Sequence, residues 1–424
     1  MSDTVTIAGR APWLADKHLQ SLLNALSGDG EEARIVGGAI RNALLGQKVS
    51  DVDIATTTLP EETMRRAAGC GFKVVPTGIE HGTVTVVAGG RPYEVTTLRA
   101  DVETDGRRAK VAFGRDWKVD AERRDFTINA LYARADGTVV DHVGGLRDIE
   151  TRTLRFIGDA ETRIREDFLR ILRFFRFFAW YGSGRPEAQG LKACTRLKDG
   201  LTGLSKERIW DELKKLLSAP DPSRALLWMR QTGVLTLILP ESEKWGIDAI
   251  HGLTRAEEEL GWEPDALLRL ESLIPPDAER MEALGERLRM SNAERARLEA
   301  WARAEALKSN LSDLGLARRI YRGSKQAIID RLRLVLAAVR VEAAGGNAAA
   351  MMEAGRYARL LEKAEAYEAP RFPLSGGDLI EAGMKKGPQV GRAQRALEDI
   401  WIESGFSLDR EALLARLPEI SGEG

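Results

Sequence analysis

The sequence predicts an α+β protein, with strands confined to an N-terminal head domain and helices throughout the remainder. Two observations support this prediction. Short β-rich runs separated by glycine turns occur before residue 100, interleaved with helix-like segments. From about residue 185 onward, apolar residues follow a helical period. We expect four parts: a head over residues 1–150, a helical neck over 151–205, a helical body over 206–300 and a helical tail over 301–424.

Within the head, strands and helices are expected to alternate before an antiparallel hairpin. Apolar spacing over residues 13–26 predicts an amphipathic helix. Then follow, in order, a strand over 34–36, a helix over 39–45 ending at Gly46, a strand over 51–55, a helix beginning near Pro60, a strand over 72–75, and a hairpin of 84–87 and 93–98 joined by Gly89 and Gly90. Residues 99–118 are polar and charged, and we expect a movable loop there.

Composition limits the classes of function. The 63 Lys and Arg residues nearly balance the 64 Asp and Glu residues, so a nucleic-acid-binding surface would have to be local. Two cysteines, Cys70 and Cys194, cannot form a disulfide framework or a cysteine-rich zinc site, and the four histidines lack metal-ligand spacing. There is no signal peptide and no apolar run long enough to span a bilayer, so we expect a cytoplasmic protein without a membrane partner.

Two aspartates on one predicted strand indicate a metal site. In a strand, Asp51 and Asp53 would point to the same face because they are two residues apart. Two carboxylates on one face are costly unless a cation lies between them. Oxygen ligands favour Mg²⁺. A lone D-x-D pattern is more often a solvated turn, so the neighbouring residues decide whether a metal site is indicated.

The turn before this strand indicates a phosphate site. Gly37 and Gly38 open the predicted helix, so backbone N–H groups can face a phosphate. Arg41, on the first turn of that helix, can reach the same phosphates. Together, Gly38, Arg41 and the two aspartates indicate a triphosphate held beside a metal pair. The pattern is neither a Walker loop nor a dinucleotide fingerprint.

A second motif, Arg123 to Leu131, reads RRDFTINAL. Arg124 can contact phosphate or ribose as a planar cation with several donors. Asp125 can accept from a ribose hydroxyl or orient that arginine. The apolar residues of the motif are expected to fix a helix against the head core.

A third motif begins at Glu166 and lies on one predicted helix over about 160–180, capped by Asp159. Asp167 and Arg170 are neighbours at i,i+3, which alone could be an ordinary intrahelical ion pair. Alternatively, a carboxylate acceptor beside a guanidinium donor complements an exocyclic amine beside a ring nitrogen. Cytosine and adenine share that edge, whereas uracil and guanine do not, so the pair could select CTP and ATP.

These motifs resemble a known family. GG-x-x-R followed by D-x-D-x-A-T, then RRDFT-x-NAL and E-D-x-x-R, is similar to the class II tRNA nucleotidyltransferases, or CCA-adding enzymes, and to related bacterial poly(A) polymerases. Both belong to the polymerase-β-like nucleotidyltransferase superfamily, so the resemblance implies a head domain of that type. One departure is local: the family usually has Asp after the Arg, where this sequence has Asn42.

The resemblance implies a template-independent enzyme. CMP and AMP would pass from CTP and ATP to the 3′ end of a tRNA, with release of pyrophosphate. Asp51 and Asp53 would hold two Mg²⁺ ions, and Glu94, on the second hairpin strand, is a candidate third carboxylate. Residues 99–118 would help to switch nucleotide choice.

Four positions on the third motif would serve the nucleotide. Asp167 and Arg170 would select the base, and Arg173 and Arg176 would support or touch the nucleotide. Because Arg176 has rotated about half a turn away from Asp167, it need not share the site.

Three alternatives stay open. The chain could be a poly(A) polymerase, or an enzyme that adds only CC or only A, or an RNA-binding protein without catalysis. Residues 75–83 lack the extra basic stretch of the bacterial poly(A) polymerases, which favours the CCA-adding type. In the tail, the basic run over 318–325 and the glycine-punctuated segment over 375–391 could contact RNA phosphates or serve as helical scaffold.

Overall fold

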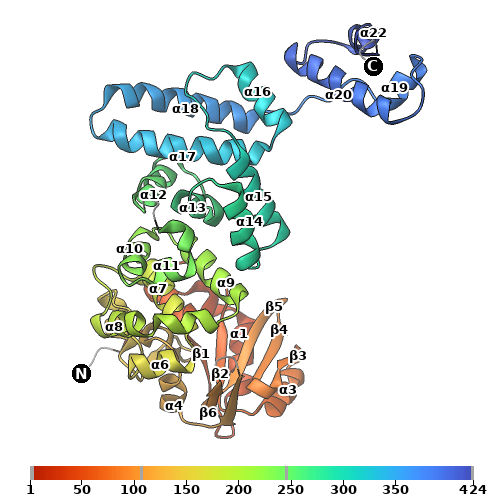
Figure 1. Cartoon of the computed structure of the whole chain (residues 1–424). Coiled ribbons are helices and arrows are strands. Elements are labelled where there is room, and N and C mark those ends of the chain that lie inside the picture. The colour runs from red at the N-terminus through yellow and green to blue at the C-terminus, as the bar shows by residue number, and fades with distance from the viewer. Residues whose placement is uncertain (1–3, 106–107, 244–246, 422–424) are drawn as a thin grey trace. The chain divides into compact units, whose positions relative to one another are not determined.

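The structure is a computed structural model that describes residues 4–105, 108–243 and 247–421 (Figure 1). The chain divides into two compact units, Met1–Lys244 and Trp245–Gly424. All the strands of the described residues lie in the first unit, and the second is helical. The predicted α+β class is therefore confirmed. The predicted four-part division stays a prediction, and its ends at residues 1–3 and 422–424 lie outside the described residues.

A seven-stranded sheet forms the framework of the head, in the order β3-β4-β5-β2-β1-β8-β9. β2 and β5 pair in parallel, and the other neighbours pair antiparallel. The strands are β1 (Ala33–Val36), β2 (Asp53–Thr56), β3 (Lys73–Gly78), β4 (Thr83–Ala88), β5 (Arg91–Thr97), β8 (Leu131–Ala133) and β9 (Val139–Asp141). Every second residue of β4 is buried, as expected for a strand with one face on the core. The predicted strands and the β4–β5 hairpin are present, although β2 begins only at Asp53.

The head helices follow capping signals in the sequence. They are η1 (Pro12–Ala15), α1 (Lys17–Leu26), α2 (Gly38–Leu44), α3 (Pro60–Gly69), η2 (Ile79–His81), α4 (Trp117–Glu122), η3 (Thr127–Asn129) and α5 (Gly145–Glu150). The single helix expected over 13–26 is divided, because Asp16 caps α1 by accepting from the backbone N–H groups of His18 and Leu19. α3 begins at Pro60, as predicted.

The loop expected over residues 99–118 is instead largely a β-hairpin. β6 (Arg99–Asp105) and β7 (Arg108–Phe113) pair antiparallel, and residues 106–107 between them lie outside the described residues. The register places Glu103 opposite Lys110 and Asp105 opposite Arg108. At its base, Gly114 N donates to Leu98 O (2.8 Å). The high charge of the segment concealed its two-residue period.

The predicted helix over 160–180 is also wrong as a single element. α6 (Ala160–Glu166) ends at Asp167, whose backbone is extended, and α7 (Leu169–Tyr181) begins two residues later. Asp167 Oδ1 accepts from the backbone N–H of Leu169, the first residue of α7 (3.1 Å). Beyond α7 lie α8 (Ala188–Leu197), η4 (Lys198–Gly203), α9 (Lys206–Leu217), α10 (Ser223–Gln231), α11 (Val234–Ile238) and η5 (Pro240–Ser242).

Aromatic side chains join α7 to the head. Phe156 stacks on Phe174 of α7 with ring centroids 5.4 Å apart, and Phe126 lies 5.2 Å from Phe177. Phe126 and Phe174 are fully buried. Aromatic contacts of this kind add to the free energy of area burial, so the sheet and α7 form one continuous core within the first unit.

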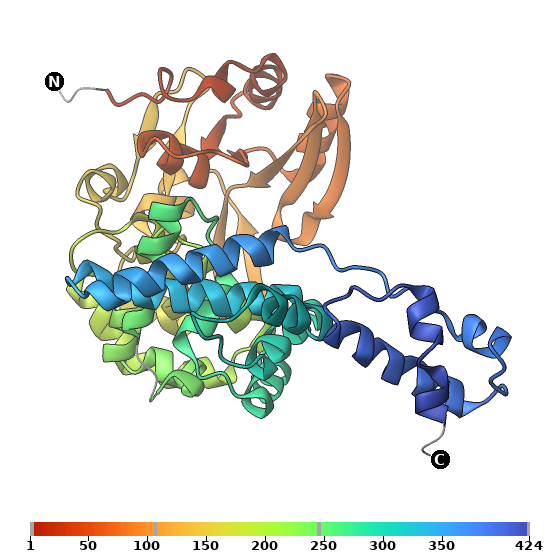
Figure 2. The same ribbon diagram turned by 90° about the horizontal axis from the view of Figure 1, so that it is seen from above.

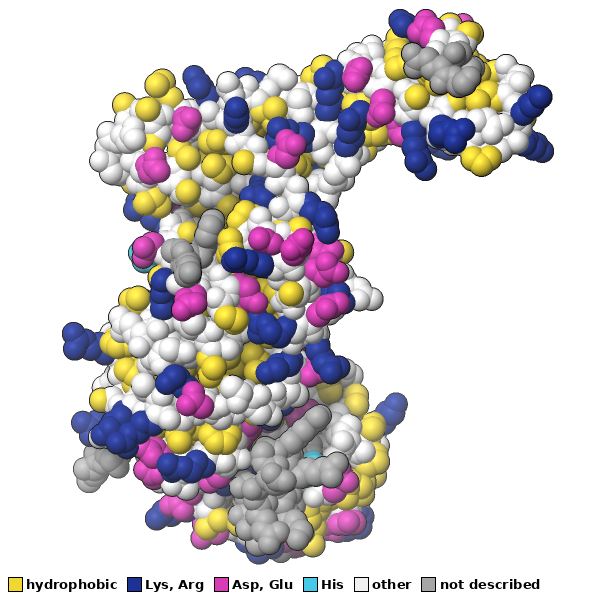
Figure 3. Space-filling view, in the orientation of Figure 1, with side chains coloured by type: hydrophobic (Ala, Val, Ile, Leu, Met, Phe, Trp, Pro, Cys, Tyr) yellow, Lys and Arg dark blue, Asp and Glu magenta, His cyan; other side chains and the backbone are white. Residues whose placement is uncertain are grey.

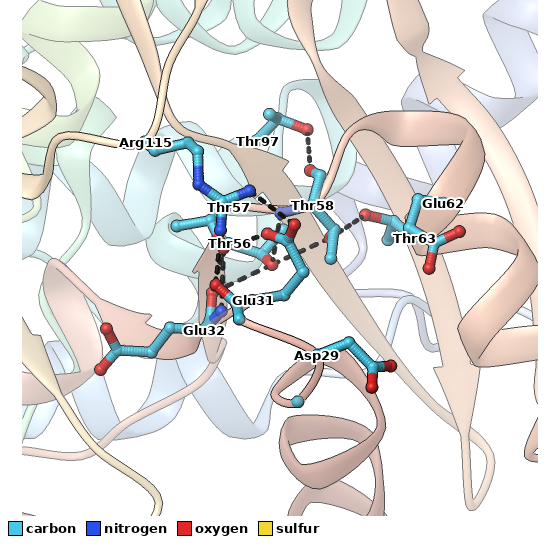
Figure 4. A network of polar contacts seen from close by, with 12 residues as sticks. Asp29, Glu31, Glu32, Thr56, Thr57, Thr58, Glu62, Thr63, Thr97 and Arg115 are labelled. Carbon is cyan, nitrogen blue, oxygen red and sulfur yellow. Dashed lines mark hydrogen bonds and ion pairs between the residues drawn. The ribbon is translucent and has the colours of Figure 1, made fainter.

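A polar network fixes the carboxyl end of β2 (Figure 4). Buried threonines bond in sequence: Thr56 with Thr58 (2.9 Å) and Thr58 with Thr63 of α3 (2.7 Å). Thr97 of β5 donates to Thr58 O (2.8 Å). Glu31, just before β1, accepts from Thr57, and Arg115 pairs with Glu31 (2.5 Å). This end of β2 is therefore held from several sides, while its amino end carries Asp53.

Two of the hydrophobic clusters among the described residues lie in the second unit. One is built by the long antiparallel pair α17 and α18 with neighbouring helices, and Figure 2 shows these two helices side by side. The other lies among the last four helices. The helices are α12 (Asp248–Leu260), α13 (Ala266–Leu273), α14 (Ala278–Arg287), α15 (Asn292–Arg303), α16 (Asp313–Arg322), α17 (Lys325–Ala344), α18 (Ala348–Ala366), α19 (Gly376–Glu381), α20 (Pro388–Glu403), α21 (Arg410–Leu414) and α22 (Leu417–Ser421). In the described part of the chain, no helix has the length and apolar character needed to cross a membrane.

Candidate active site

Three acidic residues lie close together on the neighbouring central strands β2 and β5 and in the segment before β2. This group of Asp51, Asp53 and Glu94 is called the carboxylate edge below. Asp53 begins β2, and Asp51 precedes it in the segment before the strand, where Ser50 Oγ donates to Asp51 Oδ2 (2.8 Å). β5 runs parallel to β2 with Val95 opposite Ile54, so Glu94 comes one position earlier, next to Asp53. The side chains of all three acids are exposed. The placement of Glu94 beside Asp53 agrees with its predicted position near the aspartates.

The electrostatics of this edge favour a cation. Partial removal of water from around the carboxylate raises the pKa of Asp53 to about 6. The charges of Glu94 and Asp51 add to the rise, while Arg124 opposes it. A divalent ion would remove that repulsion, and the oxygen donors suit Mg²⁺. Among the described residues, no three His, Cys, Asp or Glu side chains form a ready-made metal cluster. Mg²⁺ is commonly held by one or two carboxylates completed by phosphate oxygens and water, so this donor set fits it.

The backbone conformation of the turn before α2 favours glycine at Gly37. Its φ of 74° is in the left-handed region, and a Cβ there would lie 3.4 Å from Asn129 O and 3.9 Å from an Nη of Arg124. Its N–H donates to Leu131 O (2.9 Å). Gly38 then starts α2, as predicted. The turn therefore lies directly beside Arg124.

Arg41 is buried and fully engaged with protein groups. It donates to Asn42 Oδ1 through Nε (3.1 Å) and Nη2 (3.0 Å), to Tyr181 OH (2.8 Å) and to Asn129 Oδ1. Its guanidinium carbon lies 3.9 Å from the centroid of the Tyr181 ring. Burial lowers the pKa of Arg41, and the charge of Arg176 contributes to the lowering. An incoming anion would relieve both effects.

Asn42, the departure from the family pattern, keeps a bonding role. Besides accepting from Arg41, it donates through Nδ2 to Lys48 O (3.0 Å), in the segment that leads to Asp51. The amide therefore links α2 to the approach of the aspartates.

The helix predicted within the RRDFTINAL motif is wrong, because the motif contains only the three-residue 3-10 helix η3 and the first residue of β8. α4 ends at Glu122, and the motif continues through η3 into β8. Arg124 pairs with Asp120 (3.1 Å), a residue that sequence reasoning missed. Asp120 is 1 % exposed and also accepts from Tyr132 OH (2.7 Å), so it fixes the Arg124 guanidinium near Gly37. Only its position three residues before the double arginine hints at this role.

Asp125 orients an arginine, although not the expected one. Its Oδ2 accepts from Arg173 Nε of α7 (2.8 Å), and its Oδ1 accepts from Asn129 Nδ2 (3.1 Å). Burial opposes ionisation, but the charge of Arg173 and these hydrogen bonds hold the pKa of Asp125 below its ordinary value. Arg173 also faces Glu212 of α9 (3.8 Å).

Arg176 lies apart from Asp167, as the helical rotation predicts. Its Nε donates to Glu212 Oε2 (2.5 Å), and its guanidinium carbon lies 4.3 Å from the centroid of the Phe177 ring. Glu212 is 5 % exposed. Arg176 is therefore part of the packing between α7 and α9.

Asp167 and Arg170 bond to different partners. Asp167 Oδ2 accepts from Arg208 Nη2 of α9 (2.7 Å), whereas Arg170 pairs with Glu166 and donates to Arg163 O (2.7 Å). The intrahelical Asp167–Arg170 ion pair is therefore replaced, because Asp167 lies at the break between helices. Both side chains are largely buried, 18 % and 15 % exposed. Arg208 was missed, since a partner 41 residues away leaves no local signal.

Comparisons with known proteins agree with these motifs. Residues 33–155 match the family model described as poly A polymerase head domain, and residues 185–245 match the probable RNA and SrmB-binding site of polymerase A. The chain is 33 % identical over 405 residues to "CCA tRNA nucleotidyltransferase 1, mitochondrial" of Danio rerio, covering 92 % of this chain and 87 % of the relative. It is also 33 % identical to a "CCA-adding enzyme" of Streptococcus pneumoniae, covering 94 % of this chain and 96 % of that protein.

Solved structures show the same fold. The Bacillus stearothermophilus CCA-adding enzyme in complex with CTP aligns with a TM-score of 0.70 at 26 % identity, covering 96 % of this chain and 97 % of that one. The Thermotoga maritima CCA-adding enzyme complexed with tRNA aligns with a TM-score of 0.67 at 21 % identity, covering 99 % of each chain. With the carboxylate edge and the three arginine motifs in place, the chain belongs to the CCA-adding tRNA nucleotidyltransferase family, whose head domain is shared with poly(A) polymerases.

Proposed function

We propose that this protein adds CMP and AMP, from CTP and ATP, to the 3′ end of a tRNA without a nucleic-acid template, releasing pyrophosphate. The observation that carries the proposal is the carboxylate edge of Asp51, Asp53 and Glu94 beside Arg124, in a chain related over most of its length to CCA-adding enzymes. We place the activity in the cytoplasm, where the unpaired Cys70 and Cys194 would stay reduced.

The carboxylate edge would hold the reacting groups. Asp51 and Asp53 would bind two Mg²⁺ ions, with Glu94 as a further ligand; bound there, the ions supply activation of the attacking 3′-hydroxyl and charge neutralisation on the pyrophosphate. Arg124, fixed by Asp120, would donate to a phosphate or to the ribose. Gly38 would let the triphosphate approach the backbone, and Arg41 would exchange one of its present partners for a phosphate oxygen.

The base would be read by Asp167, two residues before α7, and by Arg170 within α7. Asp167 offers a carboxylate acceptor and Arg170 a guanidinium donor, matching the amine and ring nitrogen shared by cytosine and adenine. Arg208 holds the Asp167 carboxylate from α9 (2.7 Å), which supports a fixed reading geometry. Arg173 would support the nucleotide, and Arg176 would act through the packing of α7 against α9.

RNA would be held in part by the end of the chain. Lys and Arg side chains (dark blue) are visible on the C-terminal helices in Figure 3. The basic run over 318–325 is engaged within the protein, for example Arg318 with Ile402 O (3.0 Å) and Arg322 with Asp399 (2.6 Å). By contrast, four exposed basic residues follow α19, and we assign the RNA contact to them: Lys385, Lys386, Arg392 and Arg395.

The test is nucleotide incorporation with Mg²⁺ on a tRNA lacking its 3′ CCA, with CTP alone, ATP alone, or both. The expected product is two C and then one A. The match to a poly A polymerase head model favours one second candidate, the poly(A) polymerase. Long A tracts on any RNA primer would establish that alternative, and addition of CC without A would indicate a partial enzyme.

Base selection has its own test. Asp167→Ala removes the carboxylate acceptor, so UTP and GTP should be incorporated at rates much closer to those of CTP and ATP. A loss of one satisfied buried group is worth about 1–3 kcal/mol, or about five- to 150-fold in selectivity. Asp159→Ala is the matched control, since it removes a cap at the opposite end of α6. Unchanged selectivity in Asp167→Ala would limit Asp167 to its structural contacts with Leu169 N and Arg208.

A further inference from the structure

A continuous polar chain crosses the first unit from the head to the neck. It begins at Arg41 of α2, passes to Asn129 of η3 and Asp125, and reaches Arg173 of α7. Arg173 then faces Glu212 of α9 (3.8 Å). Each contact is a hydrogen bond or an ion pair, and the elements that it connects are distant in sequence. The chain therefore joins the predicted triphosphate residue to the helix that carries the base-reading residues.

Asn129 is the central member because only an amide satisfies both of its neighbours. A guanidinium offers only donors, and an ionised carboxylate offers only acceptors. Asn129 Oδ1 accepts from Arg41, while Nδ2 donates to Asp125 Oδ1 (3.1 Å). The side chain therefore has one favourable amide orientation. An aspartate at this position would accept from Arg41 but repel Asp125, and a leucine would serve neither.

Burial makes these contacts consequential. Arg41 is 7 % exposed, and the Asp125 side chain is 11 % exposed. A buried charged group that loses a hydrogen-bond partner recovers little from water, so it must move to find another. If Arg41 moves away, Asn129 loses a hydrogen-bond donor. The contacts of Asn129 with Asp125, and of Asp125 with Arg173, must then adjust.

We propose that Asn129 is a positioning residue that couples Arg41 to Arg173, so that the triphosphate end and the base end of the nucleotide site adjust together. This inference rests on the proposed function, because it assumes that a nucleotide spans both ends. When Arg41 turns to bind a phosphate, Asn129 transmits the movement, so that Asp125 and Arg173 move together with Arg41. Asn129 itself touches no substrate.

The test is a double-mutant cycle with and without Asn129. Arg41→Lys and Arg173→Lys keep the charge but lose the planar donor geometry. Their effects on kcat/KM and on CTP binding in the absence of RNA are measured singly and together. With Asn129 present, the combined effect should depart from the product of the single effects by at least about threefold, as is typical of residues in one polar network. In Asn129→Leu and Asn129→Asp backgrounds, the departure should fall to about one.

Controls separate coupling from loss of stability. Asn129→Leu should itself lower kcat/KM by about ten- to 100-fold, the cost of unsatisfied buried partners. Gln20→Leu also removes an amide that bridges two carbonyls, those of Leu14 and Ala135, but it lies outside the polar chain, so the cycle should keep its coupling in that background. If the Asn129 variants fail to fold, strictly multiplicative effects of the two lysine variants would by themselves overturn the proposal. If the unaltered protein neither incorporates nor binds CTP, the proposed function fails instead.

Discussion

Asp53→Asn should stabilise the metal-free protein at pH 8 and leave it unchanged at pH 4. In the folded chain, burial and the charges of Glu94 and Asp51 raise the pKa of Asp53 from 3.8 to about 6. The unfolded chain keeps the ordinary value. Between these two values the folded state binds more protons than the unfolded state, so stability falls as the pH rises through this window. Above it, the destabilisation is complete.

The magnitude follows from the pKa difference. A rise from 3.8 to about 6 corresponds to about 3 kcal/mol at full strength. Because the Asp53 side chain is exposed, screening by solvent reduces this to about 1 kcal/mol. In a unit of this size, such a change moves the melting temperature by about 2–4 °C. Asparagine removes the charge and keeps the shape, so it should recover that difference.

The assay is differential scanning calorimetry of both proteins in EDTA, following the transition of the first unit. We expect Tm to rise by about 2–4 °C in Asp53→Asn at pH 8 and by less than about 1 °C at pH 4. Glu80→Gln, which alters an exposed carboxylate of η2, is the control and should change neither value. Adding Mg²⁺ at pH 8 should stabilise only the unaltered protein. A fall at pH 8, or an equal rise at both pH values, would refute the raised pKa of Asp53.

Three further outcomes are expected. Glu212→Gln should lower the free energy of unfolding by about 3 kcal/mol, because the Arg176 guanidinium loses a buried anion; an unchanged urea midpoint would contradict this. Gly82→Ala should loosen the base of the β6–β7 hairpin, because Gly82 has a φ of 79° and the new Cβ would lie 2.7 Å from Phe113. The measurement is faster hydrogen exchange at the Gly114 amide. Gly78→Ala, whose Cβ would lie 3.7 Å from its nearest atom, is the control. Neutralising the exposed tail cations Lys385, Lys386, Arg392 and Arg395 should weaken the dependence of tRNA affinity on salt concentration. The slope should fall by about 0.7–0.9 for each phosphate that is no longer neutralised. The control Arg322→Gln, which alters a basic residue paired with Asp399, should leave the slope unchanged.

The local features of the head could be predicted from the sequence. Gly37 and Gly38 mark the turn before α2, Pro60 marks the start of α3, and alternating valines mark the hairpin of β4 and β5. These signals depend on backbone preferences and burial within a few residues, so they can be recognised without knowledge of the fold.

The errors occurred where a distant residue decides the local structure. The chain leaves the helix at Asp167, whose carboxylate accepts from Leu169 N and pairs with Arg208 on α9. Residues 99–105 and 108–113 form the strands β6 and β7, and the hydrogen bond from Gly114 N to Leu98 O closes the base of their hairpin. Arg208 and Glu212 were missed for the same reason, because each meets its charged partner only in space. Asp120 pairs with Arg124 four residues along the chain, and it was missed because its burial is not visible in the sequence.

The parallel pairing of β2 with β5 has a consequence for the order of folding. Asp53 and Glu94 become neighbours only after the chain has passed through α3, β3 and β4 and returned to the centre of the sheet. Non-local pairing of this kind is slow, because loop-closure entropy must be overcome before the contact forms. The acidic edge therefore cannot form before β5 has paired with β2, and a nascent chain that ends before residue 94 lacks Glu94 and has no complete edge to offer to a divalent ion.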